Sequence, residues 1–383
     1  MKVILVDPIT AIEYKYTFSL ANAIYDQGCE IELVVDDDDS NNSYCKCPIQ
    51  NLFLIPRKDI GKIKKAINYV NTYKYLTNAA IAEHVDIIHT QWFQLSPIDY
   101  YFLKKIKKHG IHIVTTVHDI MPFNTKFYDK IFFKKLYKLS DRIIVQAETN
   151  IKRFDDEFPE CSGKVEYIPH GHYLDFSHPI DQKLAREKLG IPLDKHVFLF
   201  FGQIKKVKGV DLLLKAFSKL VLKRKDVYLV IAGNTWKSDY DYYKKIADEG
   251  KLSDQQLKMD IRFIPDELVD YYYSACDIAV LPYTDVYQSG VVQLAYSYSK
   301  PAIVSSLKPF MEVVSDGISG LSFKAGDVDE LFNTMDKAAN MSHEDLLEMA
   351  EKGRHHIADK FSWKMIGKET YLLYESVLNK KPQ

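Results

Sequence analysis

Short apolar runs recur along the chain, and Lys-rich amphipathic stretches separate them. In the first half, the runs that predict strands cover residues 2–6, 31–35, 86–90, 112–117, 142–146 and 165–169. In the second half, they cover residues 197–202, 227–233, 261–264, 277–283, 301–306 and 321–323. Nearly continuous apolar runs are typical of strands buried on both faces of a parallel sheet. Their alternation with helical patterns predicts an α/β fold with two doubly wound units.

The boundary between the two units is expected near residues 175–195. This stretch is polar, contains two prolines and precedes the first strand of the second series, as is usual for a linker. It predicts an N-terminal domain over residues 1–176 and a C-terminal domain over residues 177–360. Two Rossmann-like domains that face a central cleft commonly bind a nucleotide-bearing ligand at the carboxyl ends of their strands.

The composition narrows the class of protein. The 383 residues are 46% apolar and 27% charged, with 51 Lys and Arg against 52 Asp and Glu. This supplies enough apolar surface for two or three globular domains and excludes a disordered chain or a disulfide scaffold. The formal net charge of −1 argues against nucleic acid as a partner, because a duplex requires a basic excess.

Cysteine content and apolar run length indicate the compartment. The five cysteines show no paired framework, which favours reduced thiols. No signal peptide precedes the first strand, and the longest apolar runs are far shorter than the roughly 20 residues that a membrane span needs. We therefore expect a cytoplasmic protein, either free or peripheral at the inner face of the membrane.

One strand-to-helix connection in the second half has the features of a phosphate-binding loop. The apolar run ends at Gly202, a short loop carries Lys205, Lys206 and Lys208, and Gly209 leads into an amphipathic helix. Such a turn directs backbone N–H groups and the positive helix end towards a ligand, and lysines add full charges for a diphosphate. The alternative is a solvated basic loop.

A second connection, within residues 281–306, is complementary to the first. Gln288, Ser289 and Gly290 follow a buried strand and open a helix of small residues. Gly290 lets a ligand approach the backbone closely, and Ser289 and the amides of Gly290 and Val291 can donate hydrogen bonds to phosphate oxygens. Alone, this segment is only a helix cap. At the same end of the same sheet as the lysine loop, it predicts half of a diphosphate clamp.

The order of several motifs along the chain carries a family resemblance. In the second half these are GxxxxxKG (202–209), AG (232–233), FIPDEL (263–268), ACDIAVLPY (275–283), QSG (288–290) followed by KP (300–301), and FMEVVSDGISGLSF (310–323). In the first half they are DIIHTQW (86–92), TVHDI (116–120) and IPHGHY (168–173), and FSWKMIGKETYLLYESVL (361–378) follows at the end. The chain resembles, over nearly its whole length, the retaining glycosyltransferases of family 4, the glycosyl transferases group 1, which have the GT-B fold.

The resemblance implies an activity. A hexosyltransferase of this kind moves a sugar from a nucleotide diphosphate sugar to a glycan or lipid-linked acceptor with retention of configuration, here in bacterial polysaccharide or glycoconjugate biosynthesis. The donor would bind mainly to the second domain, and residues 361–383 would form a C-terminal helix that packs back on the first domain. No cofactor beyond the nucleotide sugar is expected. The lysines would replace a divalent metal ion, and the run Asp36 to Asp39 is interpreted as a solvated loop.

The resemblance also assigns roles to individual residues. Lys208 matches the phosphate-binding lysine of the family, and Lys205 matches a basic residue of the same loop. Together they would stabilise the negative charge that develops on the leaving diphosphate. His118 matches a first-domain histidine near the donor sugar, the alternative being a histidine capped by backbone at a strand end. The turn at Ile264 and Pro265 would contact the base through its backbone.

One departure from the family pattern affects the expected ribose contact. Many members carry two glutamates eight positions apart, and the matching positions here are Val286 and Leu294. Neither side chain can form a hydrogen bond, so Gln293 is the candidate replacement. Two other functions therefore stay open: a catalytically silent accessory subunit that binds nucleotide sugar, and a GT-B sugar nucleotide epimerase.

Aromatic residues alternate with lysines in three stretches of the first domain, residues 60–76, 100–110 and 127–139. In the last, helical spacing places Phe127, Ile131 and Leu136 near several lysines. A basic amphipathic helix can lie in an anionic lipid interface. The alternative is a core-facing apolar stripe with a solvated lysine face. We expect that part of the 13% aromatic content contacts an anionic membrane surface or a lipid-linked acceptor.

Overall fold

The computed structural model describes residues 1–121, 127–235, 240–288 and 290–379, and the chain divides into two compact units. Unit 1 comprises Met1–Gly171 and Phe361–Gln383, and unit 2 comprises His172–Lys360. The chain thus leaves unit 1 at Gly171, slightly before the expected boundary at residue 176. It returns to unit 1 at Phe361.

Unit 1 is built on a parallel sheet with the strand order β3-β2-β1-β4-β5-β6-β7. Its strands are β1 (Lys2–Asp7), β2 (Glu30–Asp36), β3 (Ile49–Phe53), β4 (Ile87–Thr90), β5 (His112–Val117), β6 (Arg142–Val145) and β7 (Val165–Tyr167). The central strands are buried along almost their whole length, as their continuous apolar runs predict. The edge strand β3 was not predicted, because its sequence IQNLF is half polar and mostly half-buried.

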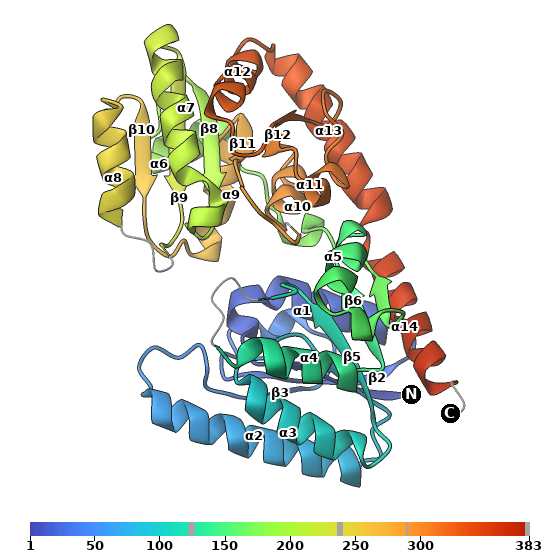
Figure 1. Cartoon of the computed structure of the whole chain (residues 1–383). Coiled ribbons are helices and arrows are strands. Elements are labelled where there is room, and N and C mark those ends of the chain that lie inside the picture. Colours follow the sequence, from blue (N-terminus) through green and yellow to red (C-terminus); the bar gives the residue numbers. More distant parts are fainter. Residues whose placement is uncertain (122–126, 236–239, 289, 380–383) are drawn as a thin grey trace. The chain divides into compact units, whose positions relative to one another are not determined.

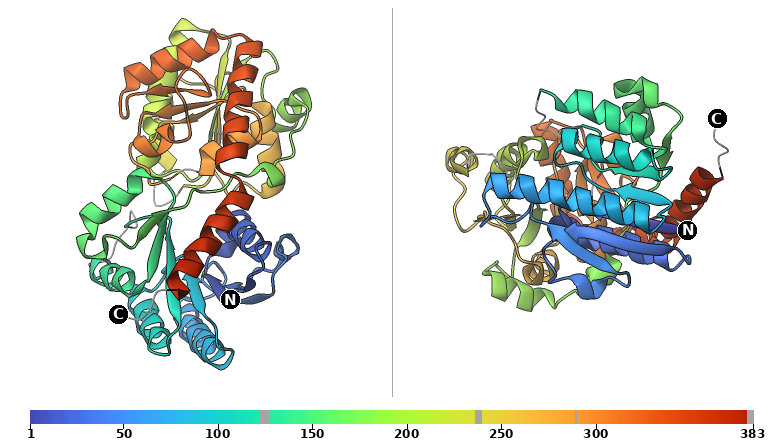
Figure 2. Two further views of the ribbon diagram at one scale, coloured as in Figure 1. Left: turned by 90° about the vertical axis from the view of Figure 1, so that its right-hand side faces the viewer. Right: turned by 90° about the horizontal axis from the view of Figure 1, so that it is seen from below.

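The helices of unit 1 cover the two faces of this sheet (Figures 1 and 2). They are α1 (Thr10–Tyr25), α2 (Lys62–Ala82), α3 (Ser96–Lys107), α4 (Asp129–Leu139), α5 (Thr149–Glu157) and α14 (Trp363–Leu378), with the 3₁₀ turns η1 (Asn42–Tyr44) and η2 (Pro159–Cys161). α2, α3 and α4 lie side by side. The C-terminal α14 lies along α1.

The aromatic residues of unit 1 divide between core and surface. Tyr69 and Tyr73 of α2 are fully buried, and Tyr73 stacks on Phe102 of α3 with ring centroids 5.6 Å apart. Leu136 of α4 is buried as well, as the alternative of a core-facing apolar stripe requires, whereas Phe127 and Ile131 are exposed. The apolar face of α4 turns Leu136 into the core because burial of that side chain is worth about 1.5–3 kcal/mol.

Unit 2 contains a second parallel sheet, with the order β10-β9-β8-β11-β12-β13. Its strands are β8 (His196–Phe201), β9 (Val227–Ala232), β10 (Leu257–Asp260), β11 (Ile278–Leu281), β12 (Ala302–Ser305) and β13 (Gly320–Phe323). The expected strand at 261–264 is wrong, since the strand lies just before it. Leu257 pairs with Leu229 of β9, whereas Arg262 and Phe263 are exposed beyond the sheet.

The helices of unit 2 are α6 (Gln182–Leu189), α7 (Val210–Lys223), α8 (Tyr240–Glu249), α9 (Asp266–Ala275), α10 (Gly290–Ser297), α11 (Lys308–Met311), α12 (Val328–Ala339) and α13 (His343–Lys360), with the 3₁₀ turns η3 (Leu174–Phe176) and η4 (Lys206–Lys208). α7 is a clear amphipathic helix. Its apolar residues Val210, Leu213, Leu214 and Phe217 recur at helical spacing and are all buried. Within the described ranges, no helix is both long and apolar enough to span a membrane.

Candidate donor-binding site

The lysine loop lies at the carboxyl end of β8, in the middle of the unit 2 sheet. It runs from Gly202 to Gly209, where α7 begins. Gly209 has φ +65°, and a Cβ atom there would lie 1.9 Å from the carbonyl oxygen of Pro282. Only glycine therefore lets this loop approach the end of β11 so closely.

Two contacts hold the lysine loop against the loop that follows β11. The Thr284 backbone N–H donates a hydrogen bond of 2.8 Å to the Val207 carbonyl oxygen. The Lys208 ammonium lies over the Tyr283 ring, with Nζ 3.8 Å from the ring centroid. This is a cation–π contact, and Tyr283 itself is buried. Tyr283 could not be predicted as a site residue from the sequence, because an aromatic residue after a strand has no distinctive spacing.

The first turn of α10 reaches the same edge of the sheet. α10 begins at Gly290, as predicted, and a Cβ atom at Gly202 would lie 3.8 Å from Val291 Cγ2. Gly202 of the lysine loop and Val291 of α10 are therefore close neighbours. Ser289, which we predicted as a phosphate ligand, lies outside the described residues.

Two glutamines were predicted near the donor, and they differ in how deeply their side chains are buried. Gln288 is half-buried, and its Oε1 atom is buried without a hydrogen-bond partner among the described residues. Gln293 is only 1% exposed, so its side chain lies within the packed interior of unit 2. Gln288 therefore places an acceptor atom just before α10, and that atom has no partner among the described residues.

The two positions at which many family members carry glutamates hold apolar side chains that are at least half-buried. Val286 is buried and Leu294 is half-buried. The neighbouring Asp285 carboxylate accepts the Val286 backbone N–H at 2.8 Å, so one carboxylate does lie in this loop. Ile264 and Pro265 lie between β10 and α9, and Pro265 precedes the first residue of α9.

His118 follows β5 in unit 1 and is only 4% exposed. Its Nε2 atom lies 3.0 Å from Gln91 Oε1. The hydrogen-bond partner of this nitrogen is therefore a side chain and not the backbone. The ring stacks on Trp92 with centroids 4.6 Å apart and is met edge-on by Tyr16 at 5.1 Å. Burial lowers the pKa of His118 to about 3, so the imidazole is neutral at physiological pH.

The acidic run at the end of β2 is only partly solvated. Asp38 and Asp39 are exposed, but Asp36 is buried and its Oδ2 accepts the Ala11 backbone N–H at 2.6 Å. Burial raises the pKa of Asp36 to about 7. The interpretation of the whole run as a solvated loop is therefore wrong for Asp36, which holds the start of α1.

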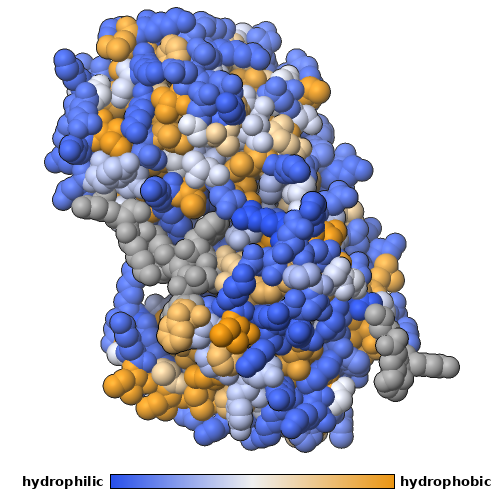
Figure 3. All heavy atoms as spheres, in the orientation of Figure 1, coloured by the Kyte–Doolittle hydropathy of each residue, from blue (hydrophilic) through white to orange (hydrophobic). Residues whose placement is uncertain are grey.

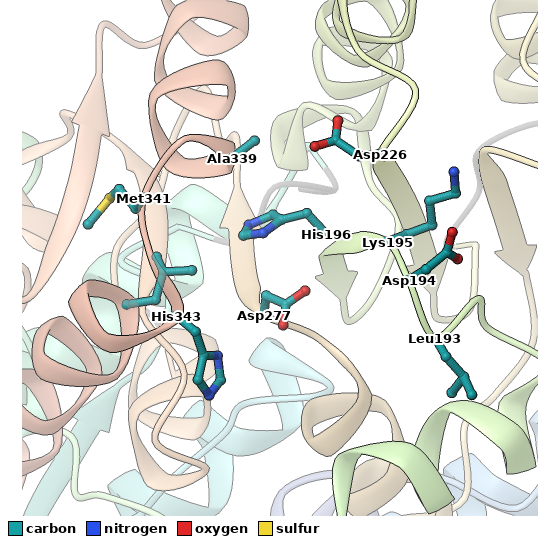
Figure 4. A pocket seen from close by; sticks show the side chains of 10 residues that line it. Leu193, Asp194, Lys195, His196, Asp226, Asp277, Ala339, Met341 and His343 are labelled. Carbon is teal, nitrogen blue, oxygen red and sulfur yellow. The ribbon is translucent and has the colours of Figure 1, made fainter.

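Neither a candidate metal cluster among the described residues nor the polar hollow of unit 2 coincides with the lysine loop. The described part of the chain has no group of three or more His, Cys, Asp or Glu side chains that could hold a metal ion. A polar hollow of about 320 Å³ in unit 2 is lined by residues such as His196, Asp226 and Asp277 (Figure 4). These residues lie at the amino ends of β8, β9 and β11, the edge opposite the lysine loop. The Asp277 carboxylate there accepts hydrogen bonds from Arg186 at 2.8 Å and from the Val197 N–H at 2.7 Å.

Two family profiles match the chain in succession. Residues 15–176 match Glycosyltransferase Family 4, and residues 181–356 match Glycosyl transferases group 1. A curated relative is the lipopolysaccharide 1,2-N-acetylglucosaminetransferase of Salmonella typhimurium, 26% identical over 232 residues. That match covers 59% of this chain and 59% of the relative's own length.

Solved structures share the fold over almost the whole chain. Sucrose-phosphate synthase from Thermosynechococcus elongatus superposes with a TM-score of 0.76 at 18% identity and covers 99% of each chain. Anabaena HepE, solved in complex with UDP and glucose, has a TM-score of 0.76 at 15% identity and covers 98% of this chain and 100% of its own. The two Rossmann-like units are those of the GT-B fold, and the chain belongs to glycosyltransferase family 4, the glycosyl transferases group 1.

Proposed function

We propose that the protein is a glycosyltransferase that moves a sugar from a nucleotide diphosphate sugar to a glycan or lipid-linked acceptor, with retention of configuration and without a metal ion. The observation that carries the proposal is the lysine loop of unit 2. Its Lys208 ammonium is held over Tyr283 at the carboxyl end of a parallel sheet, where this class of sheet binds nucleotides. The match to two glycosyltransferase profiles supports it.

The proposed reaction breaks one bond and forms one bond at the anomeric carbon of the donor sugar. The bond to the phosphate oxygen breaks, and its electron pair leaves with the nucleoside diphosphate. An acceptor hydroxyl oxygen forms the new bond on the same face of the sugar, and its proton passes to the departing phosphate. Lys205 and Lys208 stabilise the charge that develops on the diphosphate, which is the part of the barrier that fixed cations lower most.

The phosphate and ribose contacts follow from the start of α10. The amides of Gly290 and Val291 donate hydrogen bonds to the diphosphate, together with Ser289. Gln288 takes the place of the missing ribose-binding glutamate, because its Oε1 is buried without a partner in the described part of the chain. An unpaired buried carbonyl of this kind costs about 1–3 kcal/mol, and a ribose hydroxyl would remove that cost. Backbone groups at Ile264 and Pro265 contact the base.

Product analysis tests the proposal. The protein is incubated with labelled sugar nucleotides of uridine, guanosine, adenosine and deoxythymidine, with and without a glycan and lipid extract and with excess EDTA. We expect label to appear in the extract with one donor, at an unchanged rate in EDTA, and to be lost in Lys208→Ala. The variant Lys206→Ala, which removes an exposed lysine of the same loop, should keep the rate within about twofold.

The same assay separates the two other functions. An epimerase would convert the donor sugar without any acceptor and without net transfer. A silent accessory subunit, which the apolar Val286 and Leu294 would favour, would bind donor and convert nothing. Either result would contradict the transferase.

We further propose that the helix layer α2–α3–α4 contacts an anionic membrane surface, where a lipid-linked acceptor would be presented. Within these three helices the acidic residues are Asp99 and Asp129, and both are buried. Their exposed charges are all lysines, such as Lys64, Lys105 and Lys135. The chain as a whole is almost neutral, so this layer is locally basic.

Exposed apolar side chains lie among these lysines. Phe127, just before α4, is 95% exposed and Ile63 of α2 is 80% exposed, and Ile131 and Tyr101 are exposed as well. The space-filling view shows apolar atoms gathered over the start of α2 (Figure 3). Apolar groups that enter the headgroup region, with lysines around them, are the composition that binds anionic lipid.

Vesicle co-sedimentation tests the membrane contact. We expect binding to vesicles of phosphatidylserine and phosphatidylcholine, weaker binding at high salt, and little binding to phosphatidylcholine alone. The double variant Ile63→Ser/Phe127→Ser should lose most of the binding. Leu184→Ser/Leu222→Ser, which removes exposed apolar side chains of unit 2, is the matched control. Equal sedimentation of the protein with and without anionic lipid would contradict the proposal.

A further inference from the structure

Two cysteines, Cys45 and Cys47, lie on either side of Lys46 in the connection between β2 and β3. Neither is in a disulfide. Their thiol groups are hydrogen-bonded to each other, and the Cys47 backbone N–H donates to the Cys45 sulfur as well. The two sulfur atoms are therefore adjacent while both cysteines are reduced.

The side chain of Asn22, in the last turn of α1, holds the chain on both sides of Cys45. Its amide nitrogen donates a hydrogen bond of 2.8 Å to the Tyr44 carbonyl oxygen, and its amide oxygen accepts the Lys46 backbone N–H at 2.7 Å. The Lys46 ammonium pairs with the carboxylate of Asp26, the residue that ends α1, at 2.7 Å. The segment that carries the first thiol is thus fixed to one end of α1.

The chain after the second thiol is fixed to the sheet. The Leu33 backbone N–H of β2 donates to the Pro48 carbonyl oxygen at 2.9 Å. The Cα atoms of residues two apart are separated by at most about 7 Å, and disulfides span Cα separations of about 4.4–6.8 Å. Closure of a disulfide between Cys45 and Cys47 therefore needs only a small movement of a segment that is already positioned for it.

The two thiols differ in exposure and in acidity. Cys45 is half-buried, whereas Cys47 is only 6% exposed. The hydrogen bond from the Cys47 thiol lowers the pKa of Cys45, and the same contact raises the pKa of Cys47. The thiolate, not the thiol, is the nucleophile in disulfide exchange. Cys45 thus has the character of the attacking thiol, and Cys47 that of the thiol that reacts second.

The other three cysteines lack this arrangement. Cys29, Cys161 and Cys276 are at most 2% exposed. Burial raises the pKa of each thiol, to about 11 for Cys29 and to about 12 for Cys276. Buried thiols with raised pKa values are unreactive, so these three cysteines are internal controls.

We propose that Cys45 and Cys47 form a reactive dithiol, a site of reversible oxidation that closes to an intramolecular disulfide on reaction with a small disulfide such as oxidised glutathione. The Cys45 thiolate attacks one sulfur of the small disulfide, a mixed disulfide forms, and one small thiolate leaves. Cys47 then loses its proton, and its sulfur attacks Cys45 Sγ and releases the second small thiolate. The protein loses two electrons and two protons, and the small disulfide gains them and becomes two thiols. The inference does not depend on the proposed transfer reaction.

Peptide mapping tests the proposal on the folded, full-length protein. The reduced protein is incubated with oxidised glutathione at pH 7, quenched with acid at intervals, alkylated and digested with trypsin for mass spectrometry. Trypsin cleaves after Lys46, so the disulfide joins the peptides 16–46 and 47–57. We expect this joined peptide to form and to disappear with dithiothreitol, while Cys161 and Cys276 react at least about tenfold more slowly. No joined peptide, or one that forms only in urea, would overturn the proposal.

Single replacements separate the roles of the two thiols. Cys47→Ser should stop at the mixed disulfide between Cys45 and glutathione, which then accumulates. Cys45→Ser should slow the reaction of Cys47 at least about tenfold. Cys29→Ser, which removes the other cysteine of peptide 16–46, should close as fast as the wild type. A joined peptide that persists in Cys45→Ser and is lost in Cys29→Ser would contradict the pairing.

Asn22→Ala tests whether α1 positions the dithiol. The change removes both hydrogen bonds around Cys45, and alanine suits a helix. We expect attack by Cys45 within about twofold of the wild type but ring closure at least about threefold slower, so that the mixed disulfide accumulates. A merely structural role would lower the melting temperature without changing this ratio of products. Asn22→Asp, which keeps the acceptor for the Lys46 N–H, should lie between the two. Equal closure rates in Asn22→Ala and the wild type would contradict the positioning role.

Discussion

At the scale of single residues, Tyr283 decides how firmly Lys208 is held before any ligand binds. A cation–π contact of a desolvated ammonium contributes about 0.5–2 kcal/mol. Tyr283→Leu should therefore weaken the binding of nucleoside diphosphate by roughly 3- to 30-fold, because Lys208 loses its position. Tyr283→Phe keeps the ring and should bind within about twofold of the wild type. Isothermal titration measures both.

A double variant shows whether the tyrosine acts through the lysine. If it does, Tyr283→Leu/Lys208→Ala should bind no more weakly than Lys208→Ala alone, since the two losses are not additive. Additive losses would mean that Tyr283 contacts the ligand or stabilises the loop independently. Melting temperatures without ligand account for any loss of stability, since Tyr283 is buried.

Sequence and structure differ in how well they identify site residues. The positions of Gly202, Lys208 and Gly290 at strand-to-helix turns could be predicted, because glycine and lysine at such a turn have a direct physical reason. Tyr283, Trp92 and Gln91 could not, because each acts through a neighbour that is distant along the chain. The contact of Lys208 with Tyr283 joins two loops that follow different strands. No pattern of residue spacing in the sequence predicts such a contact.

At the scale of elements, the start of α1 depends on buried carboxylates. Asp36 accepts the Ala11 N–H, and Asp7 accepts the Thr17 hydroxyl at 2.6 Å. Burial raises the pKa of Asp36 to about 7 and that of Asp7 to about 6. Because both values lie above those of the unfolded chain, this contribution to stability is complete below about pH 4 and is lost as the pH rises through 6 to 7.

Asp36→Asn tests this dependence. The variant loses one acceptor at every pH, but it has no charge to bury. The melting temperature of the wild type, relative to the variant, should therefore fall between pH 5 and pH 8, by the equivalent of about 1 kcal/mol or more. The exposed Asp39→Asn is the control and should follow the wild type. A constant difference between wild type and Asp36→Asn would show that Asp36 is ionised throughout.

The C-terminal α14 is fixed to unit 1 by a close contact between Gly171 and Trp363. A Cβ atom at residue 171 would lie 2.3 Å from the Trp363 ring. Gly171→Ala should therefore displace the ring and cost about 1–3 kcal/mol, which lowers the melting temperature by several degrees. Gly61→Ala, where a Cβ atom meets nothing within 4 Å, should lower it less, because only the N-cap preference of α2 for glycine over alanine is lost. Equal melting temperatures for the two variants would contradict the contact.

Most elements could be predicted from their apolar runs, and the two errors have a common cause. β3 and β10 both lie at a sheet edge, where one side of the strand is unpaired. Edge strands carry polar and half-buried residues, so their sequences lack the continuous apolar signal. The prediction at 261–264 followed the more apolar residues, whereas pairing with β9 selects Leu257–Asp260.

At the scale of the whole molecule, the chain is nearly neutral, but its lysines are concentrated in two places. The formal net charge of −1 hides a lysine layer over α2, α3 and α4 and a lysine loop in unit 2. The aromatic residues divide in the same way, since Tyr69 and Tyr73 build the core and Phe127 remains exposed. Composition alone could not predict this division, because it depends on which side of each helix faces the sheet.

The central claim is that the lysine loop of unit 2 binds a nucleoside diphosphate, and titration calorimetry tests it most directly. UDP, GDP, ADP and dTDP are titrated into the wild type, Lys208→Ala and Lys206→Ala. At least one nucleotide should bind the wild type, Lys208→Ala should weaken it at least about fivefold, the scale of a charged hydrogen bond, and Lys206→Ala should stay within about twofold. Binding of no nucleotide, or equal binding by wild type and Lys208→Ala, would contradict the claim.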